Sequence, residues 1–288
     1  MISSNKKLDD IIKEEIKEEY EDINAYFKNL NMDRRAGLRI VGGIKLPENI
    51  MYYLFWGTII SLWATYNHTI YVPINYAIYA TLFGFQILEY DMAIAYYSPF
   101  LRSIYIKKNT IKKITNDLIN KIYSNNIEIK EDSIIEINFS GHNAVYYPVY
   151  IDKDKNNIEE IISRPLIKSV LAHEKSHQIV GKSEIKASAS EFLVYFYMYN
   201  LYKYEKAKEV VRRNIKRCAK YVESNNKYDP YTIGECYGNI VLYENDFSIN
   251  IIEEIKKLKH MKNKDIIEEV KNYTLNYSNE NILKYSLN

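Results

Sequence analysis

Two histidines and a glutamate stand close together in the stretch His173-Glu174-Lys175-Ser176-His177. On a helix, residues four apart project from the same face about one turn apart, so both imidazoles can bind one tetrahedral ion. Glu174 falls beside them and is suited to accept the proton of a metal-bound water. The spacing predicts a zinc (Zn2+) site with His173 and His177 as ligands and Glu174 as general base.

A catalytic zinc keeps three protein ligands and one water, so a third ligand is expected. We expect Glu184, because Gly181 would end the motif helix and Ser183 would cap the next one, placing Glu184 in its first turn. Two alternatives stay open. Glu191 lies two turns further along the same helix, and His142 lies in a loop before a predicted strand.

The motif helix needs definite ends if it is to present these residues. Ser163 or Arg164 would cap its start, with Pro165 in the first turn. The next helix is expected to run from Ser183 past Leu201, with short interruptions of its apolar pattern.

Other elements are predicted from periodicity. Residues 1–30 carry apolar side chains at helical spacing, typical of an amphipathic helix rather than a signal peptide. We expect a helix at 111–123, a strand within 127–139 and a second strand at 146–151. A small sheet would then precede the motif helix, and the chain after 204 is mostly helical by period.

A membrane hairpin is predicted upstream of the site, because residues 49–88 include no Asp, Glu, Lys or Arg. The gap divides into apolar runs at 50–66 and 70–88, each just short of a hydrocarbon core of about 30 Å. Basic residues flank both sides, so the positive-inside rule predicts two spans with the catalytic domain cytoplasmic. The other interpretation is a buried hairpin, favoured by the polar residues and tyrosines within it.

Bulk composition excludes little else. Lysine and arginine number 39 against 37 acidic residues, so the net charge of +2 gives no reason to expect a nucleic-acid partner. The two cysteines, Cys218 and Cys236, have neither the number nor the spacing of a disulfide framework. They are interpreted as packing residues in a reducing compartment, with a bridge between them left open.

The predicted fold class is α+β, mainly α, with a small sheet and an HExxH helix after a transmembrane or buried hairpin. Four segments are expected: an amphipathic helical segment at 1–46, the membrane hairpin at 49–100, a zinc metallopeptidase core at 105–204 and a helical C-terminal region at 205–288.

The stretch 170–177 resembles the active-site helix of gluzincin membrane peptidases of the HtpX and CAAX-protease kind. Residues 184–188 are similar to that family's ExxAD segment, in which the glutamate is the third zinc ligand. Asn143-Ala144, followed by Pro148 and Ile151, resembles its edge strand. Ser188 stands where the family has an aspartate that orients a zinc-binding histidine, so that support must be weaker or come from elsewhere.

The resemblance implies a zincin-like domain that hydrolyses peptide bonds, with a peptide or protein as substrate and a lipid bilayer as partner. Substrate would lie along the strand at 146–151. The candidate donors to the oxyanion are His142, Tyr146, Tyr195 and Tyr197. The alternatives are a non-catalytic membrane or regulatory protein with a structural metal, and a degenerate peptidase that retains only the fold.

Overall fold

The computed structural model describes residues 2–32, 36–41, 94–98, 102–125, 129–130, 132–139, 144–151, 157–225 and 227–286. Its helices are α1 (Ile2–Asn29), α4 (Lys108–Ser124), α5 (Ile158–Val180), α6 (Glu184–Met198), α7 (Glu205–Ser224), α8 (Pro230–Glu244), α9 (Ile251–His260) and α10 (Asn263–Ser286), with a short η1 (Leu201–Lys203). Its strands are β1 (Gly37–Val41), β2 (Ala95–Ser98), β3 (Ser103–Lys107), β4 (Ser133–Ile137) and β5 (Tyr147–Ile151).

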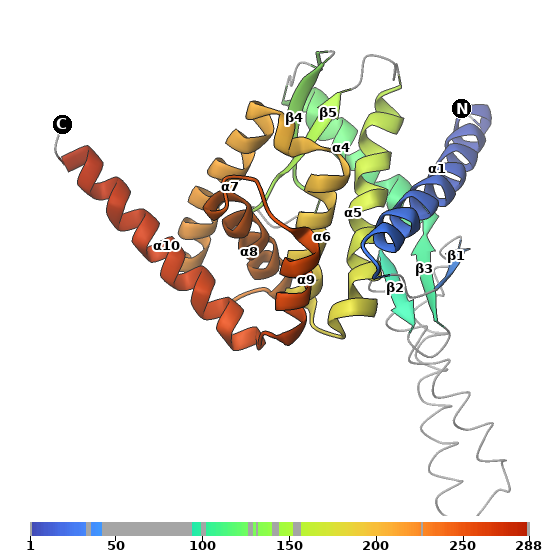
Figure 1. The fold of residues 1–288 in the computed structure, drawn as a ribbon. Coiled ribbons are helices and arrows are strands. Elements are labelled where there is room, and N and C mark those ends of the chain that lie inside the picture. Colours follow the sequence, from blue (N-terminus) through green and yellow to red (C-terminus); the bar gives the residue numbers. More distant parts are fainter. Residues whose placement is uncertain are drawn as a thin grey trace, which may run out of the picture.

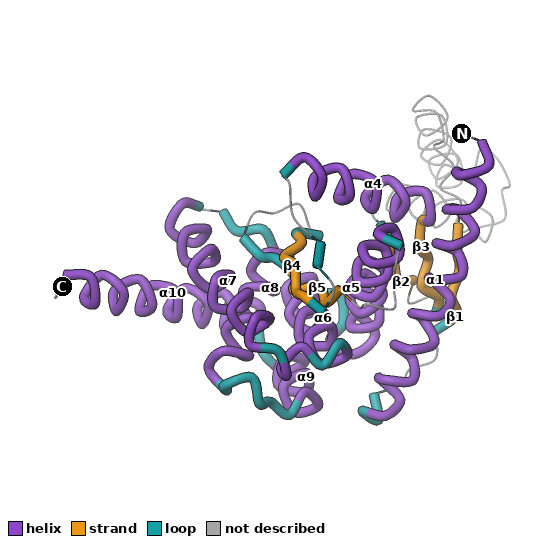
Figure 2. Tube along the Cα trace, turned by 90° about the horizontal axis from the view of Figure 1, so that it is seen from above, coloured by secondary structure: helices purple, strands orange, loops and turns teal. Residues whose placement is uncertain are grey.

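Helix α5 carries the HExxH motif and runs through the middle of the molecule (Figure 1). It packs against α6 on one side and against α1 and α4 on the other, as both views show (Figures 1 and 2). In α1, the side chains of Ile12, Ile16, Ile23 and Phe27 repeat at helical spacing and are almost completely buried. This apolar stripe is what attaches the N-terminal helix to the motif helix.

Charged side chains reinforce the contact between α1 and α5. Arg164 Nη2 lies 2.8 Å from a carboxylate oxygen of Glu18, and Lys168 Nζ lies 2.8 Å from Glu19. Lys175, within the motif, is buried and donates a hydrogen bond to Asn24 Oδ1 at 2.8 Å. The motif helix is therefore held along most of its length.

Helix α8 approaches α6 unusually closely because two of its residues have no side chain. A Cβ added at Gly234 would lie 2.3 Å from the carbonyl oxygen of Ile185 and 2.8 Å from Cβ of Ser188, and one at Gly238 would lie 3.2 Å from Cβ of Phe192. Glycine is required where backbones pass at such distances. The close packing brings the first turns of α8 to the beginning of α6.

The described strands form two small sheets. In the first, β3 pairs in parallel with β1 and antiparallel with β2, so β2 is an edge strand in the part of the chain described. In the second, β4 and β5 pair antiparallel, with Glu136 opposite Pro148. β2 packs against α5, which places an edge strand beside the motif helix.

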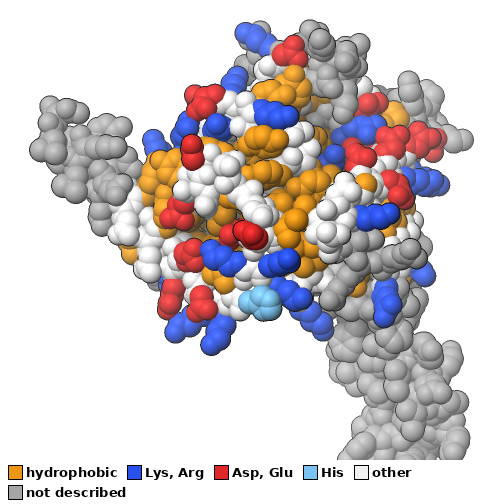
Figure 3. All heavy atoms as spheres, in the orientation of Figure 1, with side chains coloured by type: hydrophobic (Ala, Val, Ile, Leu, Met, Phe, Trp, Pro, Cys, Tyr) orange, Lys and Arg blue, Asp and Glu red, His pale blue; other side chains and the backbone are white. Residues whose placement is uncertain are grey.

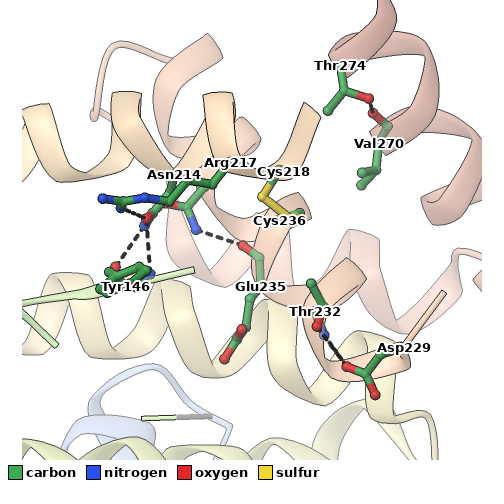
Figure 4. The surroundings of a disulfide bond; sticks show 11 residues. Tyr146, Asn214, Arg217, Cys218, Asp229, Thr232, Glu235, Cys236, Val270 and Thr274 are labelled. Atoms are coloured by element: carbon green, nitrogen blue, oxygen red, sulfur yellow. Dashed lines mark hydrogen bonds between the residues drawn. A yellow bond between two sulfur atoms is a disulfide. The ribbon is translucent and has the colours of Figure 1, made fainter. Parts of the chain in front are cut away.

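A disulfide joins Cys218 of α7 to Cys236 of α8 (Figure 4). The interpretation of the two cysteines as reduced packing residues is corrected, and the bridge left open as an alternative is what the structure contains. Its loop includes the connection between the two helices, in which Asp229 accepts a hydrogen bond from the backbone of Thr232 at 2.7 Å and caps α8. Covalent bond and cap together fix where α8 begins.

The predicted membrane hairpin at 49–100 is not supported, and the two-span, cytoplasmic-domain topology that followed from it is corrected. Within the ranges given above, no helix combines the length and the apolar character needed to cross a bilayer. Residues 42–93, which include the two apolar runs, lie outside the described residues. Runs without charge were the basis of that prediction, and such runs also occur in chains that cross no membrane.

The mainly helical character with small sheets is confirmed, as are the helix expected at 111–123 and the strands expected within 127–139 and at 146–151. The start of the motif helix was predicted wrongly. Asn157 caps it by accepting a hydrogen bond from the backbone of Glu159 at 3.0 Å, so Pro165 lies inside the helix. The sheet formed by β1, β2 and β3 was not predicted.

Candidate metal centre

Three donor atoms meet between α5 and the first turn of α6, and we call them the metal centre. Nε2 of His173 lies 3.1 Å from Nε2 of His177 and 3.0 Å from Oε2 of Glu184, and the third side, from His177 to Glu184, measures 3.2 Å. The predicted turn creates this triangle, because Gly181 ends α5 with φ at 86° and the Ser183 side chain caps α6. These three residues could hold a metal ion.

The outer nitrogens of both histidines are occupied by acceptors. Nδ1 of His173 lies 3.0 Å from a carboxylate oxygen of Glu191, and Nδ1 of His177 lies 2.8 Å from the carbonyl oxygen of Gly181. An acceptor at Nδ1 fixes the proton there in a neutral imidazole. Both Nε2 lone pairs then face each other and the Glu184 carboxylate, an arrangement that demands a positive charge at its middle.

The pKa values of His173 and Glu184 also indicate that a positive charge is favoured between these groups. Burial alone would lower the pKa of His173, but hydrogen bonds with the carboxylates of Glu184 and Glu191 raise it to about 10. Burial would raise the pKa of Glu184, yet its hydrogen bonds with His173 and His177 hold that pKa far below its usual range. A cation therefore belongs among these groups, whether a proton or a metal ion.

Glu191, weighed as an alternative ligand, binds the outer side of His173 instead. It is buried, and it also accepts hydrogen bonds from Ser169 and, at 2.8 Å, from the hydroxyl of Tyr147. Ser188, which stands in place of the family aspartate, lies 3.5 Å from the same Nδ1 atom. Glu191, about one helical turn after Ser188, therefore supplies the carboxylate that contacts Nδ1 of His173.

A second buried glutamate extends this network. Oε1 of Glu235, on α8, lies 3.1 Å from the Tyr147 hydroxyl, and Figure 4 shows the carboxylate of Glu235 pointing away from the disulfide. Burial and the nearby charge of Glu191 raise the pKa of Glu235 well above its usual range. The Tyr147 hydroxyl lies between the carboxyl groups of Glu191 and Glu235, and the raised pKa of Glu235 disfavours a second negative charge beside Glu191.

Glu174 lies next to the metal centre and is buried. Burial and Glu184 raise its pKa, while His173, His177 and a hydrogen bond with the backbone of Tyr97 lower it, and the net effect is a rise. A carboxylate with a raised pKa is a better proton acceptor than one at the ordinary value. The position and environment both suit the predicted general base.

Tyr231, in the first turn of α8, is a site residue that the sequence did not indicate. Its ring stacks on His173, with ring centroids 5.5 Å apart and planes inclined by 24°, and its hydroxyl is hydrogen bonded to Glu184. Burial and the negative charge of Glu184 raise the pKa of Tyr231, so the hydroxyl keeps its proton. The close packing of α8 on α6 brings this donor to the metal centre.

A cavity of about 590 Å³ opens over the metal centre, and we call it the site cavity. Its walls include all of the metal centre, Glu174 and Tyr231. β2 contributes Ala95, Tyr96 and Tyr97 to the wall, and Lys182 and Lys259 line it from the end of α5 and of α9.

Three of the residues expected to donate to the oxyanion, Tyr146, Tyr195 and Tyr197, are not among the described residues that line the site cavity. The hydroxyls of Tyr195 and Tyr197 donate to main-chain carbonyl oxygens at 3.2 and 2.9 Å, and the backbone of Tyr146 is hydrogen bonded to the side chain of Asn214 (Figure 4). His142, also weighed as a ligand, lies outside the described residues. The expected substrate strand at 146–151 is β5, which pairs with β4, whereas the strand lining the site cavity is β2.

Comparison with known proteins adds nothing to this geometry, because no family model, curated protein or solved structure matches the chain. The resemblance to gluzincin peptidases therefore rests on the motif residues alone.

Proposed function

We propose that this protein is a zinc-dependent peptidase. The observation that carries the proposal is the triangle of His173, His177 and Glu184, in which two imidazole nitrogens and one carboxylate oxygen lie 3.0 to 3.2 Å from one another. Glu174 and a tyrosine hydroxyl stand beside it in one cavity. That combination is what metal-assisted hydrolysis needs.

The donor set fits zinc. Two imidazole nitrogens and one carboxylate oxygen are a common set for catalytic zinc, with bonds of about 2.0–2.2 Å. Tetrahedral geometry at that bond length separates ligand atoms by about 3.3 Å, and the triangle measures 3.0 to 3.2 Å along its sides. All three donor residues line the site cavity, which a water and a substrate can enter.

Zinc bound here would act as a Lewis acid towards a carbonyl oxygen and lower the pKa of a bound water. Glu174 would accept the proton of that water and pass it to the leaving amine. The Tyr231 hydroxyl, which is hydrogen bonded to Glu184, would turn to the carbonyl oxygen of the substrate as negative charge develops there. Glu191 contacts Nδ1 of His173 and so leaves Nε2 as the atom that would bind the ion.

Substrate would bind as an added strand on β2. β2 is one of the edge strands in the described part of the chain, and its residues Ala95, Tyr96 and Tyr97 line the site cavity. Main-chain hydrogen bonds to such an edge hold an extended peptide without regard to its sequence. An extended peptide on β2 would pass in front of the metal centre, because β2 packs against α5.

The test is zinc content per chain together with cleavage of a mixed peptide library. We expect about one zinc in the wild type, loss of zinc in His177→Ala, and retained zinc with turnover lowered by at least about 10³-fold in Glu174→Gln. Glu253→Gln, at an exposed position on α9, is the matched control and should change neither.

Absence of zinc from a folded wild type would refute the metal site. Zinc without cleavage of any library peptide would instead favour a structural metal in a non-catalytic protein.

A further inference from the structure

The charged residues in the wall of the site cavity divide into two groups. The metal centre and the general base use Glu174 and Glu184. The other charged side chains among the described residues lining it are Lys182, in the turn between α5 and α6, and Lys259, near the end of α9. Apart from Glu174 and Glu184, the described wall of the site cavity therefore carries only positively charged side chains.

Neither lysine is neutralised within the described part of the chain. Both are exposed, and neither forms an ion pair there, in contrast to Lys168, Arg212 and Arg217, which lie within 4.0 Å of glutamate oxygens. Acidic and basic side chains are interspersed over the face shown in Figure 3. The wall of the site cavity differs from that mixed surface.

A third lysine holds this arrangement in place. Nζ of Lys186, on the first turns of α6, donates a hydrogen bond to the backbone carbonyl of Lys259 at 3.1 Å. The link ties the end of α9 to α6, the helix that begins with Glu184. Lys182 and Lys259 both line the site cavity, and we call these two residues the lysine wall.

We infer that the site cavity takes peptides carrying a carboxylate close to the scissile bond, which the lysine wall binds. The inference rests on the proposed peptidase function. A zinc ion would carry two positive charges, and the carboxylates of Glu174 and Glu184 balance them. The lysine wall then leaves the site cavity positive overall, and a positive cavity concentrates and orients anionic ligands.

The carboxylate has two sources in a peptide, the side chain of Asp or Glu and the free C-terminus. Exposed ammonium groups bind either one through charge-assisted hydrogen bonds. A side-chain preference makes the enzyme an endopeptidase for acidic sequences, and a terminal preference makes it a carboxypeptidase or dipeptidase.

The experiment uses zinc-loaded full-length protein and three matched fluorogenic peptides. The first has Glu beside the scissile bond and an amidated C-terminus, the second has Gln and an amidated C-terminus, and the third has Gln and a free C-terminus. The second peptide is the neutral partner of each of the other two. Binding is measured separately, by fluorescence anisotropy with the Glu174→Gln variant, so that affinity is obtained without turnover.

We expect one carboxylate-bearing peptide to exceed its neutral partner by about 10-fold in kcat/KM, mainly through KM, with the same order in binding. Lys182→Glu and Lys259→Glu should each remove about 3- to 10-fold of this preference, and the double variant should reverse it. Lys256→Glu, an exposed lysine on α9 outside the cavity wall, is the control and should leave the preference intact. Raising the salt concentration should reduce the preference.

Equal kcat/KM and equal binding within both peptide pairs would overturn the inference and leave the peptidase proposal standing. Conversely, no cleavage of any peptide refutes the proposed function, while the anisotropy measurements still decide whether the site cavity selects carboxylates. A preference that survives in the double lysine variant would also overturn the assignment to the lysine wall.

Discussion

Nδ1 of His173 and Oε2 of Glu191 lie 3.0 Å apart, and the two residues belong to different helices that meet only because α6 folds back on α5. The contact sets the tautomer of the histidine and turns its Nε2 towards the other donors. It makes Glu191 a positioning residue rather than a ligand, with consequences that can be measured.

Glu191→Gln should weaken zinc binding by about 10- to 100-fold, because the outer carboxylate raises the basicity of the bound imidazole. The amide retains the shape of the side chain, so the fold should persist, as circular dichroism can verify. Affinity is measured by competition with a chelator, with Glu253→Gln as the exposed control. Unchanged affinity would show that Glu191 has no part in setting the histidine.

Tyr231→Phe should lower kcat by about 10²-fold with little change in KM, because one oxyanion donor is lost while the ring still stacks on His173. Zinc content should stay the same, which separates this effect from metal loss. Tyr204→Phe, at an exposed tyrosine outside the cavity wall, is the control. A fall in zinc content would instead make the tyrosine a support for Glu184.

Gly234→Ala should destabilise the fold by at least about 2 kcal/mol, because the new methyl group would meet the backbone of α6 at 2.3 Å. Gly238→Ala meets its neighbours at 3.2 Å and should cost less. Urea unfolding of both variants gives the comparison. Equal, small effects would mean that α8 can move away from α6 without loss.

Glu15 should make stability fall as the pH rises. Burial raises its pKa to about 7 in the folded protein, against hydrogen bonding from Ser163 and the charge of Arg164, from an ordinary value of 4.5. The folded state therefore binds the proton more tightly, and the stabilisation present below pH 4.5 is lost towards pH 7. As the pH rises across this range, the unfolding midpoint of the wild type should fall relative to that of Glu15→Gln. A constant difference between the two midpoints would contradict the raised pKa.

Breaking the disulfide should lower the free energy of unfolding by about 3 kcal/mol, the value for a loop of this order of length. Cys218 and Cys236 are 18 residues apart in the sequence. The double variant Cys218→Ser/Cys236→Ser, studied by thermal unfolding, tests the change without a reductant that could remove zinc. The metal centre should remain assembled, since none of its ligands lies on α7 or α8.

The residues of the metal centre could be predicted because their arrangement depends on neighbours in the sequence. Spacing by four places His173 and His177 on one helical face, and the glycine and serine of the next turn bring Glu184 round to meet them. The same locality explains the correct helix at 111–123 and strand at 146–151. Short-range periodicity determined these parts before any tertiary contact was known.

Other features of the site depend on contacts between segments that are distant in the sequence. The sequence alone therefore could not show which residues take part in them. Tyr231 is one of 29 tyrosines, and only the packing of α8 on α6 distinguishes it. The signal that was present is Gly234 and Gly238, spaced to let one helix face approach another closely. Glu191 was weighed only as an alternative third ligand, because its contact with the outer nitrogen of His173 depends on the path of α6.

The close seating of α8 on α6 also defines the smallest active unit. A fragment ending with α6 would include the HExxH motif and the third ligand, yet it would lack Tyr231, Glu235 and the cavity wall at Lys259. Such a fragment could capture a metal ion and still be inert. Under the proposed function, the complete site would therefore form late in biosynthesis, only after the chain has been extended through α9 and folded back.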